Sequence, residues 1–261
     1  MLYMELEINP KNEKPLDNIK DDGGYTAIFR TIACIGDSLS SGEFEAAKED
    51  GTSSYHDMFE YSWGQFIARM CGSRVYNMSR GGMTAKEYLE SFADYNGFWD
   101  GKYASQAYVI ALGVNDLFGL KQPVGTLGDV NFDDPNKNNT EVFAGCYAAI
   151  IQRLKKIQPK AKFFLVTMPR EIDGNDDLKK EHSRLLYGLA EKFDNTYVID
   201  LNRYAPVYDE NFKKNFYLRG HLNPMGYLLT AKMIASYIDF IIRHNMNEFK
   251  EVGFIGTSLH A

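Results

Sequence analysis

From residue 29 onward, the sequence alternates short apolar runs with longer segments of helical periodicity. The apolar runs predict five strands, at Thr31–Ile35, Arg74–Asn77, Tyr108–Leu112, Phe163–Met168 and Tyr197–Leu201. The periodic segments predict four helices, at Asp57–Cys71, Glu141–Ile157, Asp176–Phe193 and Pro224–Asn245. Strands and helices that alternate in this way form a parallel sheet through right-handed crossovers, with helices on both faces. We therefore expect an α/β fold, a three-layer α/β/α sandwich around a central parallel sheet.

The length of 261 residues fits one large α/β domain, and no internal repeat or linker divides the chain. Residues 1–28 are polar and rich in Lys, Asp, Asn and Gly, which predicts an irregular N-terminal arm. We expect the folded domain to span residues 29–250, followed by a C-terminal tail over residues 251–261.

The net charge of −6 argues against nucleic acid as the main partner. The longest apolar-rich stretch, Tyr227 to Ile242, is broken by polar residues, so it predicts a core-facing helix and no membrane partner. Three widely spaced cysteines indicate buried free thiols in a reducing compartment, and the amino terminus does not resemble a secretory signal. We expect a cytoplasmic protein without a metal or cofactor, and the sequence leaves its oligomeric state open.

A candidate nucleophile follows the first predicted strand, in the segment Gly36-Asp37-Ser38-Leu39. Reacting groups in open α/β sheets gather just outside the carboxyl ends of the strands, which is where this turn delivers Ser38. Asp-Ser after glycine is also ordinary turn chemistry, so the tetrapeptide by itself leaves both interpretations open.

Four segments together resemble the four sequence blocks of the SGNH hydrolase superfamily, also called GDSL-type esterases and lipases. The resemblance covers about residues 30–245 and follows the family's order and spacing. The segments are Gly36-Asp37-Ser38-Leu39, Asn77-Met78-Ser79-Arg80-Gly81-Gly82-Met83-Thr84, Gly113-Val114-Asn115-Asp116 and His221-Leu222-Asn223-Pro224-Met225-Gly226. The resemblance implies a flavodoxin-like sandwich and a hydrolase that acts on carboxylic esters.

The family's roles carry over to matching positions of this chain. Ser38 is then the nucleophile and His221 the general base. The backbone amides of Ser38 and Gly82 and the side-chain amide of Asn115 form the oxyanion hole. A serine hydroxyl needs an adjacent base at neutral pH, and a tetrahedral intermediate needs fixed hydrogen-bond donors, so these residue types suit the chemistry. The absence of a Gly-x-Ser-x-Gly segment argues against the α/β-hydrolase fold.

One position departs from the family's pattern. The aspartate usually found three residues before the histidine is replaced here by Leu218. Three alternatives follow: a backbone carbonyl orients the imidazole in a Ser-His dyad, a carboxylate from elsewhere substitutes, or the site is weakened. We favour the dyad. Candidates for a substituting acid, by proximity in the sequence, are Asp200, Asp209 and Glu210.

These features predict a serine esterase that removes a small acyl group, such as acetyl, from a carbohydrate or similar polar alcohol. The long segments Ser40–His56 and Phe118–Thr140 are expected to be loops that line the substrate cleft. The aromatic side chains of Phe44, Tyr55 and Tyr217 are candidates for stacking on sugar rings. A lysophospholipase or acyl-thioesterase is one alternative, and a carbohydrate-binding pseudoenzyme is another. His182 is expected on a helix surface or at a helix end.

Overall fold

The computed structural model describes residues 8–172 and 174–259. Five strands form one parallel sheet in the order β4-β1-β5-β6-β7. Their bounds are β1 (Thr31–Gly36), β4 (Arg74–Asn77), β5 (Ala107–Ala111), β6 (Lys162–Val166) and β7 (Thr196–Ile199). Each strand overlaps one of the predicted strands, and the predicted three-layer α/β/α sandwich is confirmed.

The order of the strands creates a crevice at the carboxyl ends of β1 and β5. From β1 the chain crosses to β4 at the edge of the sheet, and it then returns to β5 on the other side of β1. Cys34 of β1 is thus paired with Asn77 on one side and with Val109 on the other. A sheet whose strand order reverses in this way leaves a crevice between the diverging connections, and ligands bind there.

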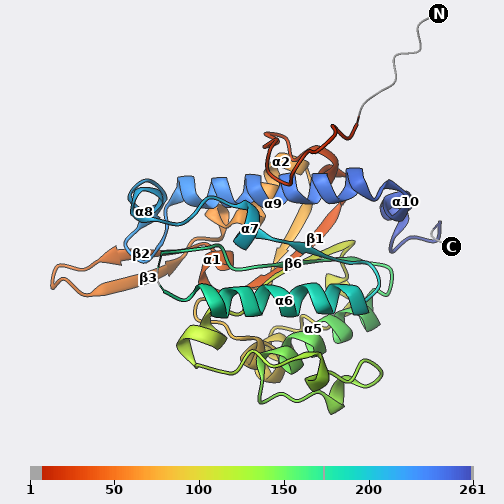
Figure 1. Ribbon diagram of the computed structural model, residues 1–261, viewed down its shortest axis with the longest axis horizontal. Coiled ribbons are helices and arrows are strands. Elements are labelled where there is room, and N and C mark those ends of the chain that lie inside the picture. The colour runs from red at the N-terminus through yellow and green to blue at the C-terminus, as the bar shows by residue number, and fades with distance from the viewer. Residues whose placement is uncertain (1–7, 173, 260–261) are drawn as a thin grey trace, which may run out of the picture.

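Two pairs of helices cover the sheet (Figure 1). The helices α2 (Trp63–Cys71) and α9 (Pro224–His244) pack on one face, whereas α5 (Phe143–Ile157) and α6 (Asp176–Lys192) pack on the other. The side chains of β1 alternate between the two cores: Ile32 and Cys34 face α2 and α9, and Ala33 and Ile35 face the opposite layer. Burial on both faces explains why the inner strands β1, β5 and β6 are almost uniformly apolar.

The helix α9 is long and apolar enough to cross a membrane by length and composition alone. In the fold, however, 72% of its most apolar window is buried, as expected for the core helix that the sequence predicts. Asn223 caps this helix by accepting a hydrogen bond from the amide of Gly226, and Pro224 occupies its first turn.

The predicted loop Ser40–His56 is wrong in its secondary structure. It contains most of an antiparallel hairpin formed by β2 (Glu43–Ala47) and β3 (Ser53–Asp57), preceded by the short helix α1 (Ser38–Ser41). The hairpin also explains why α2 begins at Trp63 and not at the predicted Asp57, since Asp57 ends β3 and Ser62 caps the helix. The segment Phe118–Thr140 begins at the end of a π-helical turn, Asn115–Gly119, and is otherwise irregular apart from the 3₁₀ turns Leu127–Asp129 and Pro135–Lys137.

The remaining elements are short and lie in the connections. The helices are α3 (Ala85–Glu87), α4 (Ala93–Tyr95), α7 (Leu201–Tyr204), α8 (Glu210–Phe216) and α10 (Met246–Phe249). A small antiparallel hairpin is formed by β8 (Tyr217–Leu218) and β9 (His221–Leu222), directly before α9.

Residues 8–28 run along α9 (Figure 1). Their main anchor is Arg243, which bonds to Glu13 of this segment and to Asp239 of its own helix. Tyr25 adds a backbone bond to the carboxylate of Asp239. Residues 1–7 of the predicted arm and residues 260–261 of the predicted tail lie outside the described part of the chain.

Candidate active site

Ser38 is the first residue of α1, directly after β1. Asp37 caps this helix, because its side chain accepts a hydrogen bond of 3.0 Å from the amide of Leu39. Asp37 thus shapes the turn that presents the serine. Burial raises the pKa of the Asp37 carboxyl to about 7, and the nearby carboxylates of Asp116 and Glu43 act in the same direction.

The second and third sequence blocks meet beside this turn. The side-chain amide of Asn115, which follows β5, donates to the carbonyl of Met83 at 3.1 Å. Its neighbour Asp116 accepts from the amide of Ala85 at 2.8 Å. Gly82 has a φ of 71°, a conformation that favours glycine. The two blocks are therefore held together by Asn115 and Asp116, and Gly82 lies immediately before the residue that Asn115 contacts.

Ser38, Asn115 and His221 line one cleft with a volume of about 350 Å³. They come from the carboxyl end of β1, the carboxyl end of β5 and the hairpin before α9. The cleft is further lined by charged side chains, Glu171, Lys179, Lys213 and Arg219. Lys213 and Lys179 each pair with Glu171, so this part of the lining is polar and carries both signs of charge.

His221 is the first residue of β9, and Arg219 and Gly220 form the turn before it. The two nitrogen atoms of its imidazole contact two glutamates of β2. Nδ1 lies 3.5 Å from Oε2 of Glu45, a hydrogen-bonding contact longer than the usual distance of about 2.7–3.2 Å. Nε2 lies 3.2 Å from Oε1 of Glu43. The ring of Tyr55 packs edge-to-face on the imidazole, with 5.7 Å between ring centroids.

The two glutamates differ in their electrostatic setting. Hydrogen bonds from the Ser53 hydroxyl and the Gly220 amide hold the pKa of Glu45 at about 2, so it is ionised at neutral pH. Burial raises the pKa of Glu43, and the nearby imidazole of His221 partly opposes this shift. Glu43 also packs tightly on the second block, because a Cβ at Gly81 would lie 2.0 Å from its Oε2.

The three acids proposed from sequence proximity lie at the starts of the helices α7 and α8. Asp200 caps α7 and accepts hydrogen bonds from Thr167 and Tyr187. Asp209 caps α8 through the amide of Phe212, and Glu210 lies in the first turn of that helix. Within residues 8–172 and 174–259, the carboxylates that contact His221 are those of Glu43 and Glu45. The partner of Nδ1 is thus a side chain and not the backbone carbonyl of the favoured dyad.

Sequence reasoning missed Glu43 and Glu45 because they lie within the segment expected to be a loop. The signal available was the alternation Glu43-Phe44-Glu45, which in a strand places both acids on one face. Phe44 points the other way, into a small core with Tyr227 and Leu222. Of the aromatic candidates, Tyr217 lines the cleft and Tyr55 lies beside His221, whereas Phe44 is packed in the interior.

His182 does not lie on the surface, as the sequence suggested, but is completely buried. Its ring packs on Phe143, and a Cβ at Gly113 would lie 2.9 Å from Nε2. Burial lowers the pKa of His182 to about 4, so the imidazole is neutral at pH 7. His182 thus packs against Gly113, the first residue of the third block.

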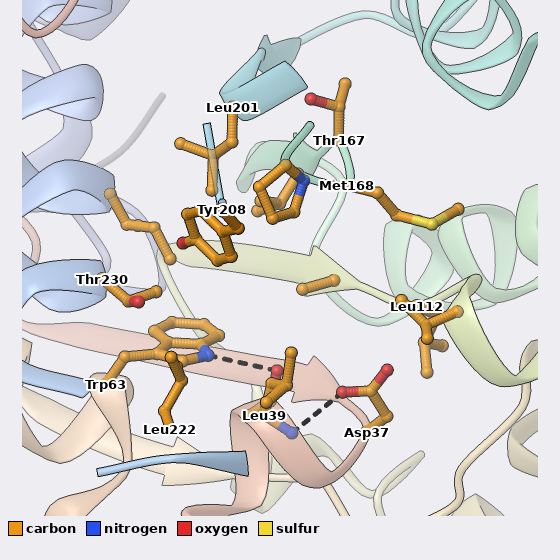
Figure 2. A pocket seen from close by; sticks show the side chains of 16 residues that line it. Asp37, Leu39, Trp63, Leu112, Thr167, Met168, Leu201, Tyr208, Leu222 and Thr230 are labelled. Carbon is orange, nitrogen blue, oxygen red and sulfur yellow. Dashed lines mark hydrogen bonds between the residues drawn. The ribbon is translucent and has the colours of Figure 1, made fainter. Parts of the chain in front are cut away.

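A second, apolar cavity of about 70 Å³ adjoins the cleft (Figure 2). Leu39, Asp37 and Met168 border both spaces. As Figure 2 shows, Trp63, Leu222 and Tyr208 also face this cavity, and the Trp63 indole donates to the hydroxyl of Ser40. The volume corresponds to about two water molecules at roughly 30 Å³ each.

The strand order and the four blocks gathered at one crevice define an SGNH-type hydrolase. The chain belongs to the GDSL-like Lipase/Acylhydrolase family, whose model matches residues 34–229. No protein of curated function matches the sequence.

Solved structures share the fold at low sequence identity. A family two carbohydrate esterase from Clostridium thermocellum, in complex with cellohexaose, is 18% identical with a TM-score of 0.57. The match covers 84% of this chain and 65% of that one, so this chain spans less than two thirds of the esterase structure. A putative lipolytic protein of the G-D-S-L family from Desulfitobacterium hafniense DCB-2 is 18% identical with a TM-score of 0.52, covering 80% of this chain and 99% of the other. A family 3 carbohydrate esterase from Clostridium thermocellum is 13% identical with a TM-score of 0.51, covering 82% and 98%.

Proposed function

We propose that this protein is a serine esterase that removes a small acyl group, such as acetyl, from a carbohydrate or similar polar alcohol. The observation that carries the proposal is the convergence of Ser38, Asn115 and His221 on one cleft at the crevice of the sheet. The three side chains supply a nucleophile, an uncharged hydrogen-bond donor and a base, which are the parts that acyl transfer requires.

In the proposed mechanism, Oγ of Ser38 attacks the ester carbonyl while His221 accepts the hydroxyl proton. The carbonyl oxygen becomes an oxyanion that accepts hydrogen bonds from the amides of Ser38 and Gly82 and from Nδ2 of Asn115. The intermediate collapses, the alkoxide takes the proton from His221, and the acyl group remains on Ser38. Water, deprotonated by His221, then attacks the acyl-enzyme and releases the acid and the free serine.

Two features of the cleft support the choice of substrate. Its charged lining residues, including Lys213, Arg219 and Glu171, offer hydrogen-bonding partners to a hydroxyl-rich alcohol. The adjoining apolar cavity of about 70 Å³ suits a short acyl group, since drug-sized ligands occupy pockets of about 300–1,000 Å³. Carbohydrate esterases of the same fold are consistent with this choice.

The test is hydrolysis of p-nitrophenyl acetate, butyrate and octanoate by the parent protein and by Ser38→Ala, followed by release of acetate from an acetylated oligosaccharide. We expect the highest kcat/KM on acetate, acetate release from the sugar, and no activity in Ser38→Ala. A rise in kcat/KM with chain length would favour a lysophospholipase or acyl-thioesterase. Absence of turnover on every ester would favour a carbohydrate-binding pseudoenzyme.

A further inference from the structure

Leu218 stands where the family usually has the aspartate that contacts the histidine, and the imidazole of His221 contacts Glu45 instead. Leu218 is directly opposite His221 in the β8–β9 hairpin, and its side chain is 46% exposed. On the other side of the hairpin lies β2, which brings the Glu45 carboxylate to Nδ1 of His221. Gly220 leaves room for this approach, because a Cβ there would lie 2.6 Å from Oε2 of Glu45.

Glu45 is held in this place by groups other than the histidine. Its Oε2 accepts from the Gly220 amide at 2.8 Å, in addition to facing Nδ1 of His221. Its Oε1 accepts from the Ser53 hydroxyl at 2.5 Å and from Nε of Arg219 at 3.3 Å. The side chain is only 11% exposed. Three donors other than the histidine fix this carboxylate, so its position does not depend on the imidazole. It can therefore orient the ring.

We infer that Glu45 is the positioning residue that orients His221, in place of the aspartate replaced by Leu218. This inference rests on the proposed serine-esterase function. A carboxylate at Nδ1 keeps the proton on that nitrogen and the lone pair on Nε2, which is the form of the ring that can accept the proton of Ser38. The same negative charge stabilises the imidazolium that forms when the proton is transferred.

Other charged and titratable groups also face this pair and bear on its pH dependence. Arg219 pairs with Glu45, whereas Glu43 contacts Nε2 of His221 and is itself close to Asp57. Tyr55 covers the ring. Glu43 cannot take the role of Glu45, because it lies at Nε2, the nitrogen that accepts the serine proton, and so it cannot hold the ring proton on Nδ1. The two glutamates share one strand face but contact different nitrogens of His221. Only Glu45, at Nδ1, is expected to orient the base.

The first test compares Glu45→Gln with Glu49→Gln, the same change at an exposed position of the same hairpin. Glutamine keeps the size of the side chain and removes its charge. We expect Glu45→Gln to lower kcat on p-nitrophenyl acetate by about 10²-fold or more, with KM within about threefold of the parent. We expect Glu49→Gln to match the parent. A Glu45→Gln variant with kcat within threefold of the parent would overturn the inference, as would a loss confined to KM.

The second test does not depend on activity. The ring nitrogens of His221 are followed by ¹⁵N NMR from pH 4 to 9 in the parent and in Glu45→Gln. We expect the proton of the neutral ring to reside on Nδ1 in the parent, and the midpoint of ring titration to move about one pH unit lower in the variant, because a nearby negative charge is removed. An unchanged midpoint and tautomer would overturn the inference.

The two proposals can fail separately. If the parent hydrolyses no ester while the titration of His221 still responds to Glu45, the proposed function fails and the coupling between the two side chains stands. If ester hydrolysis requires Ser38 but the titration and the turnover are insensitive to Glu45, the proposed function stands and the role of Glu45 is wrong.

Discussion

Oε2 of Glu45 lies 3.5 Å from Nδ1 of His221, although 176 positions separate the two residues in the chain. The contact exists because β2 folds back beside the short hairpin that carries His221, at the same end of the sheet as Ser38. A site assembled from such distant segments depends on the connections between strands as much as on the catalytic groups.

Replacement of Asn115 by alanine tests the oxyanion hole. We expect Asn115→Ala to lower kcat on p-nitrophenyl acetate by about 10²–10³-fold with little change in KM, because the donor acts mainly on the charge of the transition state. The same amide bonds to Met83, so circular dichroism should first establish that the fold is intact. An unchanged kcat would contradict the assignment.

Asp37 is expected to make stability depend on pH above pH 4. Burial raises the pKa of its carboxyl to about 7, whereas the unfolded chain titrates near its ordinary value of about 4. The folded state therefore binds the proton more tightly, and stability from this group falls as the pH rises from about 4 to about 7. Asp37→Asn keeps an acceptor for the amide of Leu39 and removes the charge. Urea unfolding should show the parent losing stability relative to this variant between pH 5 and pH 8, and a parallel pH dependence would contradict the prediction.

His182 is expected to destabilise the fold in acid. Its pKa is about 4 in the folded protein, below the ordinary value of about 6.5, so folding favours the neutral ring. The stability that this group contributes is complete above pH 6.5 and is lost as the pH falls toward 4. Between pH 7 and pH 4.5 the parent should lose about 2–3 kcal/mol more than His182→Leu in urea unfolding. His56→Leu, at an exposed position, is the control, and equal losses in parent and His182→Leu would show that the buried ring does not resist protonation.

The buried contact between Glu13 and Arg243 is expected to hold residues 8–28 on α9. Both side chains are nearly inaccessible, with 3% and 6% exposure. Without Glu13, Arg243 would keep the carboxylate of Asp239 and two neutral acceptors, the Ile8 carbonyl and Oδ1 of Asn9. Because breaking a buried pair leaves charge uncompensated, Glu13→Gln should lower the free energy of unfolding by about 1–3 kcal/mol. Glu60→Gln, which breaks the exposed pair with Arg69, should cost less than about 1 kcal/mol. Equal effects of the two changes would argue against the anchoring role.

Local sequence patterns were sufficient to predict the central sheet and the long helices that cover it. The strands β1, β5 and β6 were identified by apolar runs because both of their faces are buried, which leaves few polar residues in each. The strands β4 and β7 lie at the edges of the sheet and were also found. The start of α9 was equally local, since Asn223 and Pro224 satisfy the first turn with their own chemistry. The four blocks were identified by their resemblance to the family, and their placement at strand ends and at the start of α9 agrees with it.

Only the tertiary structure decided what surrounds the base. The β2–β3 hairpin is half exposed and rich in polar residues, so nothing in its composition distinguishes it from a loop until its two strands pair. Burial of His182 likewise depends on Phe143 and Gly113 from other segments. The sequence by itself determined the five strands of the central sheet, the four long helices and the candidate reactive side chains. The neighbours of His221 were decided by contacts between residues far apart in the chain, and local propensity carries no information about such contacts.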